Sequence, residues 1–341
     1  MGKHWIAAFI VSVLLTTISV QPAKADSPVT STAFYEAYMD VDIVKEAADS
    51  GTVTESIAQY LDKEEHPIDV KAAVVNALGW SFNGKTNADK YVRLSFGMVR
   101  KDLELAELRG DQLLVLGYLL AMDDYFDTGD AEKVLLQAKD RMPDSFTAAM
   151  IHAIVAAQGK TDWQDVWRPA ARVAFDPRLT SAMDMRPEAA KIIIDYMVLY
   201  SEKRVINPFE PENRIVLQIG KSSYSLNGTV FDIDPGYGTV PQIKSDQAFL
   251  PVRFLVEAVG GSIHWDSREQ KVTIAANGIS MKLYIGNRTV EVDGQPVELE
   301  EAPYLAGSRT MLPFRFIGEQ LGFTVSWNDE RKEIELLRKR P

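Results

Sequence analysis

The sequence predicts an α+β protein of two parts: an all-helical N-terminal part and a C-terminal antiparallel β-sheet and helix module with an internal duplication. Three observations predict this. Between residues 33 and 200, apolar residues recur at helical spacing. After prolines 208 and 211, the pattern changes to the alternation of strands. Short stretches of the C-terminal part then occur twice at a fixed spacing, which is typical of a repeated supersecondary unit.

The first 25 residues have the three-part layout of a secretory signal peptide. Lys3 precedes an apolar run from Ile6 to Val20, and the small residues Ala23 and Ala25 stand before Asp26 as a cleavage site. A membrane anchor is the competing interpretation, but this run is shorter than the roughly 20 apolar residues that span a bilayer. We therefore expect a secreted or cell-wall-associated protein with no membrane span after signal removal.

Composition limits the chemistry that the chain can carry. It has no cysteine, so it can form neither a disulfide nor a thiolate metal site. Its net charge is −11, and residues 26–206 hold 30 acidic against 20 basic side chains, whereas residues 207–341 hold 18 against 15. Because phosphate binding needs clustered Lys and Arg, the acidic helical part argues against nucleic acid as its partner. The nearly balanced C-terminal part leaves that question open, and we expect no nucleic acid as a partner. No cofactor is expected either.

The helical part is expected over residues 33–206, after a linker at 26–32. Within residues 111–178 a weak period stands out: Leu116-Gly117-Tyr118, Gly129-Asp130, Ala138 and Pro143, with Pro177 following Pro143 at the spacing of one tetratricopeptide repeat. This pattern resembles the helix-turn-helix unit of those repeats. An irregular α-helical domain remains the alternative.

A linker at residues 207–212 precedes the C-terminal module, residues 213–341. Leu250-Pro251-Val252-Arg253-Phe254 returns further along the chain as Leu312-Pro313-Phe314-Arg315-Phe316. Asn227-Gly228 returns as Asp293-Gly294 at a slightly longer offset, and this slip indicates one loop that differs in length. We place the two repeats at about 215–278 and 281–338. In each, proline opens a helix and glycine ends it, at Gly260 and Gly322.

The density of these motifs over about residues 213–337 resembles the copper amine oxidase N-terminal domain, also called the stalk domain. That resemblance implies a small antiparallel sheet curled around a helix, as found on secreted proteins of Gram-positive bacteria. It does not imply oxidase activity. The tyrosine motif of those enzymes does not occur in this sequence. Their three copper-binding histidines have no counterpart either, because His66, His152 and His264 are isolated in sequence. No copper is expected.

Two pairs of repeated residues are candidates for binding or for structure. Arg253 and Arg315 could hold a ligand, or each could brace its hairpin through carbonyls or through Glu257 and Glu319. Trp265 and Trp327 could be sugar-stacking platforms or core anchors. Because both pairs have the same place in both repeats, we favour structural roles for them, as for Gly260 and Gly322.

Functional residues are therefore expected where the repeats differ. The longer loop from Phe231 to Lys244 in the first repeat is the candidate binding loop, with Asp232, Asp234 and Tyr237. Asp232 does not begin an EF-hand, because the twelfth position from it is Ile243 in place of a glutamate.

The sequence contains none of the common catalytic motifs, neither a nucleophile elbow nor a P-loop nor His-Glu-x-x-His. We expect a non-catalytic exported protein that binds a cell-wall polymer or a protein. The alternatives are a hydrolase with catalytic carboxylates in the helical part and a purely structural spacer.

Overall fold

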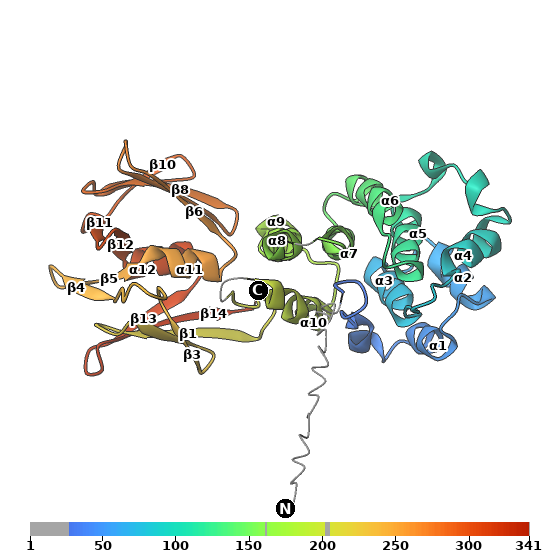
Figure 1. The fold of residues 1–341 in the computed structure, drawn as a ribbon, viewed down its shortest axis with the longest axis horizontal. Helices are drawn as coiled ribbons and strands as arrows, with labels where there is room; N and C mark the ends of the chain where they lie inside the picture. Colours follow the sequence, from blue (N-terminus) through green and yellow to red (C-terminus); the bar gives the residue numbers. More distant parts are fainter. Residues whose placement is uncertain (1–26, 161, 202–204, 341) are drawn as a thin grey trace, which may run out of the picture.

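The computed structural model describes residues 27–160, 162–201 and 205–340. Helices make up the N-terminal half as far as Tyr200, and the C-terminal half begins with a strand at Glu212. The two halves lie end to end, with α8, α9 and α10 nearest the strands (Figure 1). This arrangement confirms the predicted α+β architecture. The predicted signal peptide and its cleavage residues Ala23, Ala25 and Asp26 lie outside the described residues.

Polar side chains cap some of the helices of the N-terminal half. Thr54 and Ser145 accept backbone N–H groups of Ile57 and Ala148 at the starts of α2 and α7. The α-helices are α1 (Asp42–Ser50), α2 (Glu55–Asp62), α3 (Ile68–Ala77), α4 (Asn87–Phe96), α5 (Gly110–Asp123), α6 (Gly129–Arg141), α7 (Phe146–Ala157), α8 (Trp163–Ala174), α9 (Pro177–Thr180) and α10 (Pro187–Met197). Short 3-10 helices are η1 (Phe34–Tyr38), η2 (Arg100–Asp102), η3 (Leu105–Glu107) and η4 (Val198–Tyr200). None of the helices in the described ranges is both long enough and apolar enough to cross a membrane.

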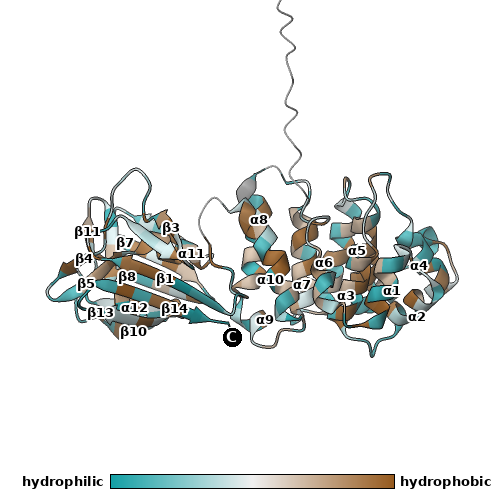
Figure 2. Ribbon diagram, turned by 90° about the horizontal axis from the view of Figure 1, so that it is seen from below, coloured by the Kyte–Doolittle hydropathy of each residue, from teal (hydrophilic) through white to brown (hydrophobic). Residues whose placement is uncertain are grey.

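The core of this half is centred on α5 and α7, whose residues are nearly all buried. Hydrophobic segments run through both helices (Figure 2). Gly117 allows α6 to approach α5 closely, because a Cβ at this position would lie 2.8 Å from Cγ of Leu135. Helices α5 and α6, and then α7 and α8, pack as consecutive pairs.

The strands of the C-terminal half form three antiparallel sheets in the described residues. Their bounds are β1 (Glu212–Gln218), β2 (Ser223–Leu226), β3 (Thr229–Asp232), β4 (Gln242–Lys244), β5 (Gln247–Pro251), β6 (Ser262–Asp266), β7 (Lys271–Ala276), β8 (Ile279–Tyr284), β9 (Thr289–Val292), β10 (Gln295–Glu298), β11 (Tyr304–Ala306), β12 (Arg309–Pro313), β13 (Thr324–Asn328) and β14 (Glu333–Lys339). Helix α11 (Val252–Ala258) follows β5 and helix α12 (Phe314–Gln320) follows β12. Copy one contains β1–β7 with α11, and copy two contains β8–β14 with α12.

Each sheet is shared between the two copies. The sheet β13-β14-β1-β2-β3 joins the last hairpin of copy two to the first strands of copy one. The sheet β10-β9-β8-β7-β6 joins the last hairpin of copy one to the first strands of copy two. The sheet β11-β12-β5-β4 takes two strands from each copy. Helices α11 and α12 lie between the sheets (Figure 1). The resemblance implied one small sheet around one helix, whereas here three sheets surround two helices, because neither copy closes a core by itself.

The two copies differ in length at one loop. In copy one, the segment from the end of β3 at Asp232 to the start of β4 at Gln242 connects two sheets. Its counterpart in copy two, from the end of β10 at Glu298 to the start of β11 at Tyr304, is shorter. The extra length of copy one therefore lies between β3 and β4, inside the predicted binding loop.

Both copies contact the helical half, and copy one does so at the end of its helix. Gly260, two residues after the end of α11, has a backbone φ of +69°, and a Cβ there would lie 2.7 Å from the ring of Phe175. Gly278, between β7 and β8, packs in the same way against Pro177, because a Cβ at this position would lie 3.0 Å from Cδ of Pro177. The backbone N–H of Ile206 donates to the carbonyl of Ala258 at 2.8 Å. Strand β14 adds Arg338, whose guanidinium lies 5.8 Å from the centre of the Phe175 ring.

Candidate functional site

Two grooves in the C-terminal half are the candidate binding sites. Groove 1 has a volume of about 800 Å³ and lies against α11 and β6 of copy one. The loop after β3 and the β11–β12 turn of copy two complete it, so both copies build this one site. Its lining residues used below are Tyr224, Phe231, Asp232, Asp234, Arg253, Phe254, Glu257, Trp265, Ser267, Gln270, Ser308 and Arg309.

One side of groove 1 is aromatic. Tyr224 of β2 contacts Phe231 and Phe254, with ring centres 5.8 and 5.0 Å apart. Tyr224 and Phe254 are buried, while Phe231 and Trp265 are half-buried and leave ring surface accessible. Rigid rings of this kind offer large contact areas at a low cost in side-chain entropy. This side can therefore pack against a flat, weakly polar ligand surface.

The rim of groove 1 is held by an ion pair between the copies. Asp234 of copy one lies 2.5 Å from Nε of Arg309 in copy two, and both side chains are mostly buried. Thr239 donates a further hydrogen bond to Asp234 at 2.8 Å. Burial by itself raises the pKa of Asp234, but the bonds from Arg309 and Thr239 outweigh it and hold this pKa below its usual range. The carboxylate is therefore charged and fixed at the groove.

Tyr237 extends this rim. Its ring lies under the guanidinium of Arg309, 4.0 Å from carbon to ring centre, and its side chain is 71 % exposed. This residue belongs to the longer loop of copy one, whose extra length thus supplies a partner for Arg309. Of the three residues of the predicted binding loop, Asp232 and Asp234 line groove 1, and Tyr237 is placed beside them through Arg309.

Groove 2 is the counterpart of groove 1 in copy two. It measures about 680 Å³ and lies against α12 and β13, closed by the segment after β10 and by the β4–β5 turn of copy one. Its lining residues used below are Asp246, Gln247, Glu298, Glu300, Phe314, Arg315, Glu319, Trp327, Asp329 and Lys332. Nearly every one occupies the position that corresponds, between the copies, to a lining residue of groove 1. The duplication therefore produced two sites as well as two fold units.

The repeated arginines lie on the outer side of their helices. Arg253 is 3.5 Å from Glu257, and Arg315 is 3.7 Å from Glu319, one helical turn away in each case. Each pair lines its groove. The carboxylates predicted as partners are thus the ones in contact, and the arginines are about half exposed to solvent.

The repeated tryptophans also line the grooves. Trp265 and Trp327 are half-buried, so each indole packs on the module with one part and faces its groove with another. Trp327 donates from Nε1 to Asp329 at 3.3 Å. Gly260 and Gly322 both have positive φ at the ends of their helices, as expected of helix-ending glycines.

Several groove residues could not be found from the sequence pattern. Arg309, Asp246 and Gln247 come from the turn of the opposite copy, which reaches a groove only through the shared four-stranded sheet. One sequence signal was available: Arg309 and Gln247 occupy corresponding positions, because each is the first residue of the strand that precedes its helix. At this position the two copies differ by one full charge.

The histidines are dispersed through the described residues. His66 stacks on Tyr60, with ring centres 3.8 Å apart, His152 lies on α7, and His264 lies on β6. In the described parts of the chain, no three His, Asp or Glu side chains are grouped so that they could hold a metal ion.

Comparison with known proteins gives one match. No curated protein and no solved structure matches the chain. The tetratricopeptide-like resemblance of residues 111–178 is not confirmed by any comparison and stays a prediction. The match is to a family model and begins after β3, so it leaves out the first three strands that the resemblance had included. Residues 235–336 match the family model of the copper amine oxidase N-terminal domain, which supports the family indicated by the repeated motifs.

Proposed function

We propose that this chain is a non-catalytic, exported binding protein that holds a neutral strand of cell-wall glycan in groove 1. The observation that carries the proposal is the combination of an accessible aromatic side with a rim of fixed, mutually paired charges. The matched family is an accessory domain of copper amine oxidases and is not their catalytic part, which fits a module that binds without reacting.

The charges of groove 1 favour a ligand rich in hydroxyl groups. Asp232, Asp234 and Glu257 accept hydrogen bonds, whereas Arg253 and Arg309 only donate them. Three acidic and two basic side chains leave a net charge of −1. A sugar hydroxyl both donates and accepts, so it can bond to either kind of group. A strongly charged ligand would gain little from so balanced a rim.

The aromatic side supplies the second half of sugar recognition. A pyranose ring has a face of C–H groups that packs against an indole or a phenyl ring. Trp265 and Phe231 offer such surfaces at the groove. A groove of about 800 Å³ has room for a short segment of a longer chain. Residence in the cell wall would then follow from export, as the predicted signal peptide suggests.

The test measures binding of the full chain to purified Gram-positive cell wall and to soluble glycan fragments by co-sedimentation and calorimetry. Trp265→Leu keeps an apolar side chain but removes the ring. We expect it to weaken glycan binding roughly tenfold, which corresponds to about 1.4 kcal/mol. Trp327→Leu in groove 2 is the matched control and should leave glycan affinity close to that of the parent chain. Unchanged glycan binding in the Trp265 variant would overturn the proposal.

The hydrolase alternative has less support. It requires two carboxyl groups with raised pKa values in one cleft of the helical half. Burial raises the pKa of Asp123, on α5, but both grooves described above lie in the C-terminal half. Release of reducing sugar ends from cell wall by the purified chain would favour the hydrolase over the binding protein.

A further inference from the structure

The two grooves share a scaffold but differ in charge. At four corresponding positions, the polar residues of groove 1 and groove 2 differ in charge: Ser267 against Asp329, Gln270 against Lys332, Ser308 against Asp246, and Arg309 against Gln247. Groove 2 therefore has five carboxylates (Asp246, Glu298, Glu300, Glu319 and Asp329) against two cations (Arg315 and Lys332). Its net charge is −3, compared with −1 for groove 1.

The carboxylates of groove 2 are only partly neutralised. Lys332 pairs with Asp329 at 2.8 Å, Arg315 lies 3.7 Å from Glu319, and Arg288, outside the groove lining, lies 3.8 Å from Glu298. Among the described residues, no cation pairs with Asp246 or Glu300. Glu300 is instead hydrogen-bonded to the amide of Gln247. The groove thus keeps negative charge that an incoming cation can neutralise.

The aromatic surfaces of groove 2 already carry cations of the chain itself. Nζ of Lys332 lies 5.9 Å from the centre of the Trp327 ring, and the guanidinium of Arg315 lies 5.6 Å from that of Phe314. These distances lie within the range of cation–π attraction. Both basic side chains are more than half exposed, so they can move aside at little cost when a ligand cation takes their place.

The lining of groove 2 also contains a hydrogen-bond acceptor without a partner among the described residues, on Gln247. Oε1 of Gln247 is buried and has no hydrogen-bond partner in the described residues, although its own amide N–H bonds to Glu300. A buried acceptor without a partner is uncommon in folded proteins. A ligand that carries several N–H donors could satisfy it after a small shift of the side chain.

From these contacts we infer that groove 2 binds a basic peptide segment, whose lysine or arginine side chains enter between the carboxylates and the rings of Trp327 and Phe314. Excess negative charge, aromatic faces that accept cations and an unpartnered acceptor all favour a ligand of ammonium or guanidinium groups. This site is separate from the glycan site proposed for groove 1 and does not depend on it. The copies have thus diverged into two sites of different ligand chemistry.

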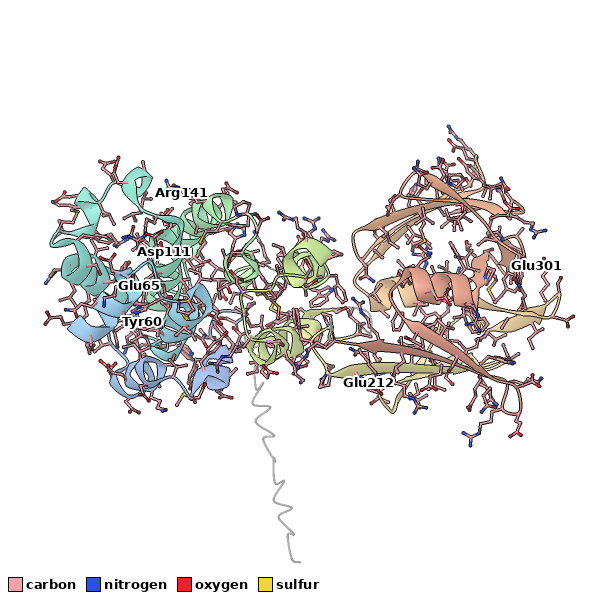
Figure 3. The ribbon with its side chains drawn as sticks, turned by 180° about the vertical axis from the view of Figure 1, so that it is seen from behind. Tyr60, Glu65, Asp111, Arg141, Glu212 and Glu301 are labelled. Atoms are coloured by element: carbon pink, nitrogen blue, oxygen red, sulfur yellow. The ribbon has the colours of Figure 1, made fainter. Side chains whose placement is uncertain are left out.

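The loss test uses an oligolysine peptide as the probe. The full chain and the double variant Glu298→Gln/Asp329→Asn are titrated by calorimetry at low and at high salt. We expect the variant to bind roughly tenfold more weakly or worse, and we expect binding by the parent chain to weaken as salt rises. The control Glu301→Gln/Glu330→Gln removes the same charge close by, outside the groove lining. Glu301 lies at the outer edge of this half (Figure 3), and its control variant should bind like the parent.

A gain test uses the other copy. Ser267→Asp/Ser308→Asp places the two carboxylates of groove 2 at the corresponding positions of groove 1 and changes its net charge from −1 to −3. Ser308 already has a left-handed backbone with φ of +66°, which aspartate tolerates. We expect this variant to bind a second oligolysine molecule.

Three results would overturn the inference. These are the absence of oligolysine binding at low salt, equal weakening in the control and groove variants, and displacement of oligolysine by neutral glycan. Glycan binding is measured separately, so failure at groove 2 can be told apart from failure at groove 1. Circular dichroism of each variant identifies any that does not fold.

Discussion

Copy one and copy two of the C-terminal half have the same parts in the same order, yet they meet different surroundings. Copy one packs on the helical half through Gly260 and has a nearly balanced groove. Copy two leaves the end of α12 at Gly322 without such a contact and has an acidic groove. The helix, the arginine and the tryptophan are therefore the parts that both copies kept after the duplication. The rims and helix ends were free to change.

The largest difference between the copies should appear at the two helix-ending glycines. In Gly260→Ala the new Cβ would meet the Phe175 ring at 2.7 Å, which costs about 1–3 kcal/mol of folding free energy by overpacking. The left-handed backbone adds about 1–2 kcal/mol. Gly322→Ala should show only the second cost, since its nearest neighbour is 3.9 Å away. Chemical denaturation measures both, and equal losses would contradict the close packing of Gly260 on Phe175.

A smaller effect is expected from the ion pair that only groove 1 possesses. Arg309→Gln gives copy two the residue found at the corresponding position of copy one and leaves Asp234 mostly buried without its cation. We expect a loss of about 1.5–3 kcal/mol, the range for hydrogen bonds to charged groups. The reverse substitution, Gln247→Arg, adds a cation beside Glu300 and should not destabilise the fold to that extent. Denaturant midpoints of the two variants give the comparison.

The same ion pair should give stability a pH dependence. The pKa of Asp234 is held below its usual range in the folded protein, so its contribution is present above the unfolded value of about 3.9. That contribution is lost as the pH falls through the folded pKa. Asp234→Asn should therefore lower the melting temperature at neutral pH, and its difference from the parent chain should shrink below about pH 4. A difference that persists unchanged in acid would contradict the ion pair.

The smallest effect is expected at Asp329. The hydrogen bond from Lys332 lowers its pKa, but this carboxylate is exposed. Solvent screens such pairs, so we expect Asp329→Asn to change thermal stability little while it weakens the binding of oligolysine. A melting curve and a titration of the same preparation separate the two effects.

Local sequence signals predicted much of the C-terminal half. Pro251 and Pro313 precede α11 and α12, and Asn227-Gly228 forms a tight turn with positive φ at both residues. The sharing of strands between the copies could not be predicted, because alternation indicates a hairpin but does not say which hairpin lies beside it. For the same reason the contact between Asp234 and Arg309, which are distant in sequence, has no local signal. The tryptophans were expected in the core, but their half-buried position at the grooves depends on that pairing.

One duplicated scaffold thus carries two proposed sites of different ligand chemistry. This proposal is tested most directly by titrating Trp265→Leu and Glu298→Gln/Asp329→Asn with both soluble cell-wall glycan and oligolysine. We expect a crossed result: the first variant loses glycan binding and retains oligolysine binding, and the second does the opposite. If either variant kept its fold but bound glycan and oligolysine with equally reduced affinity, the existence of two separate sites would be contradicted.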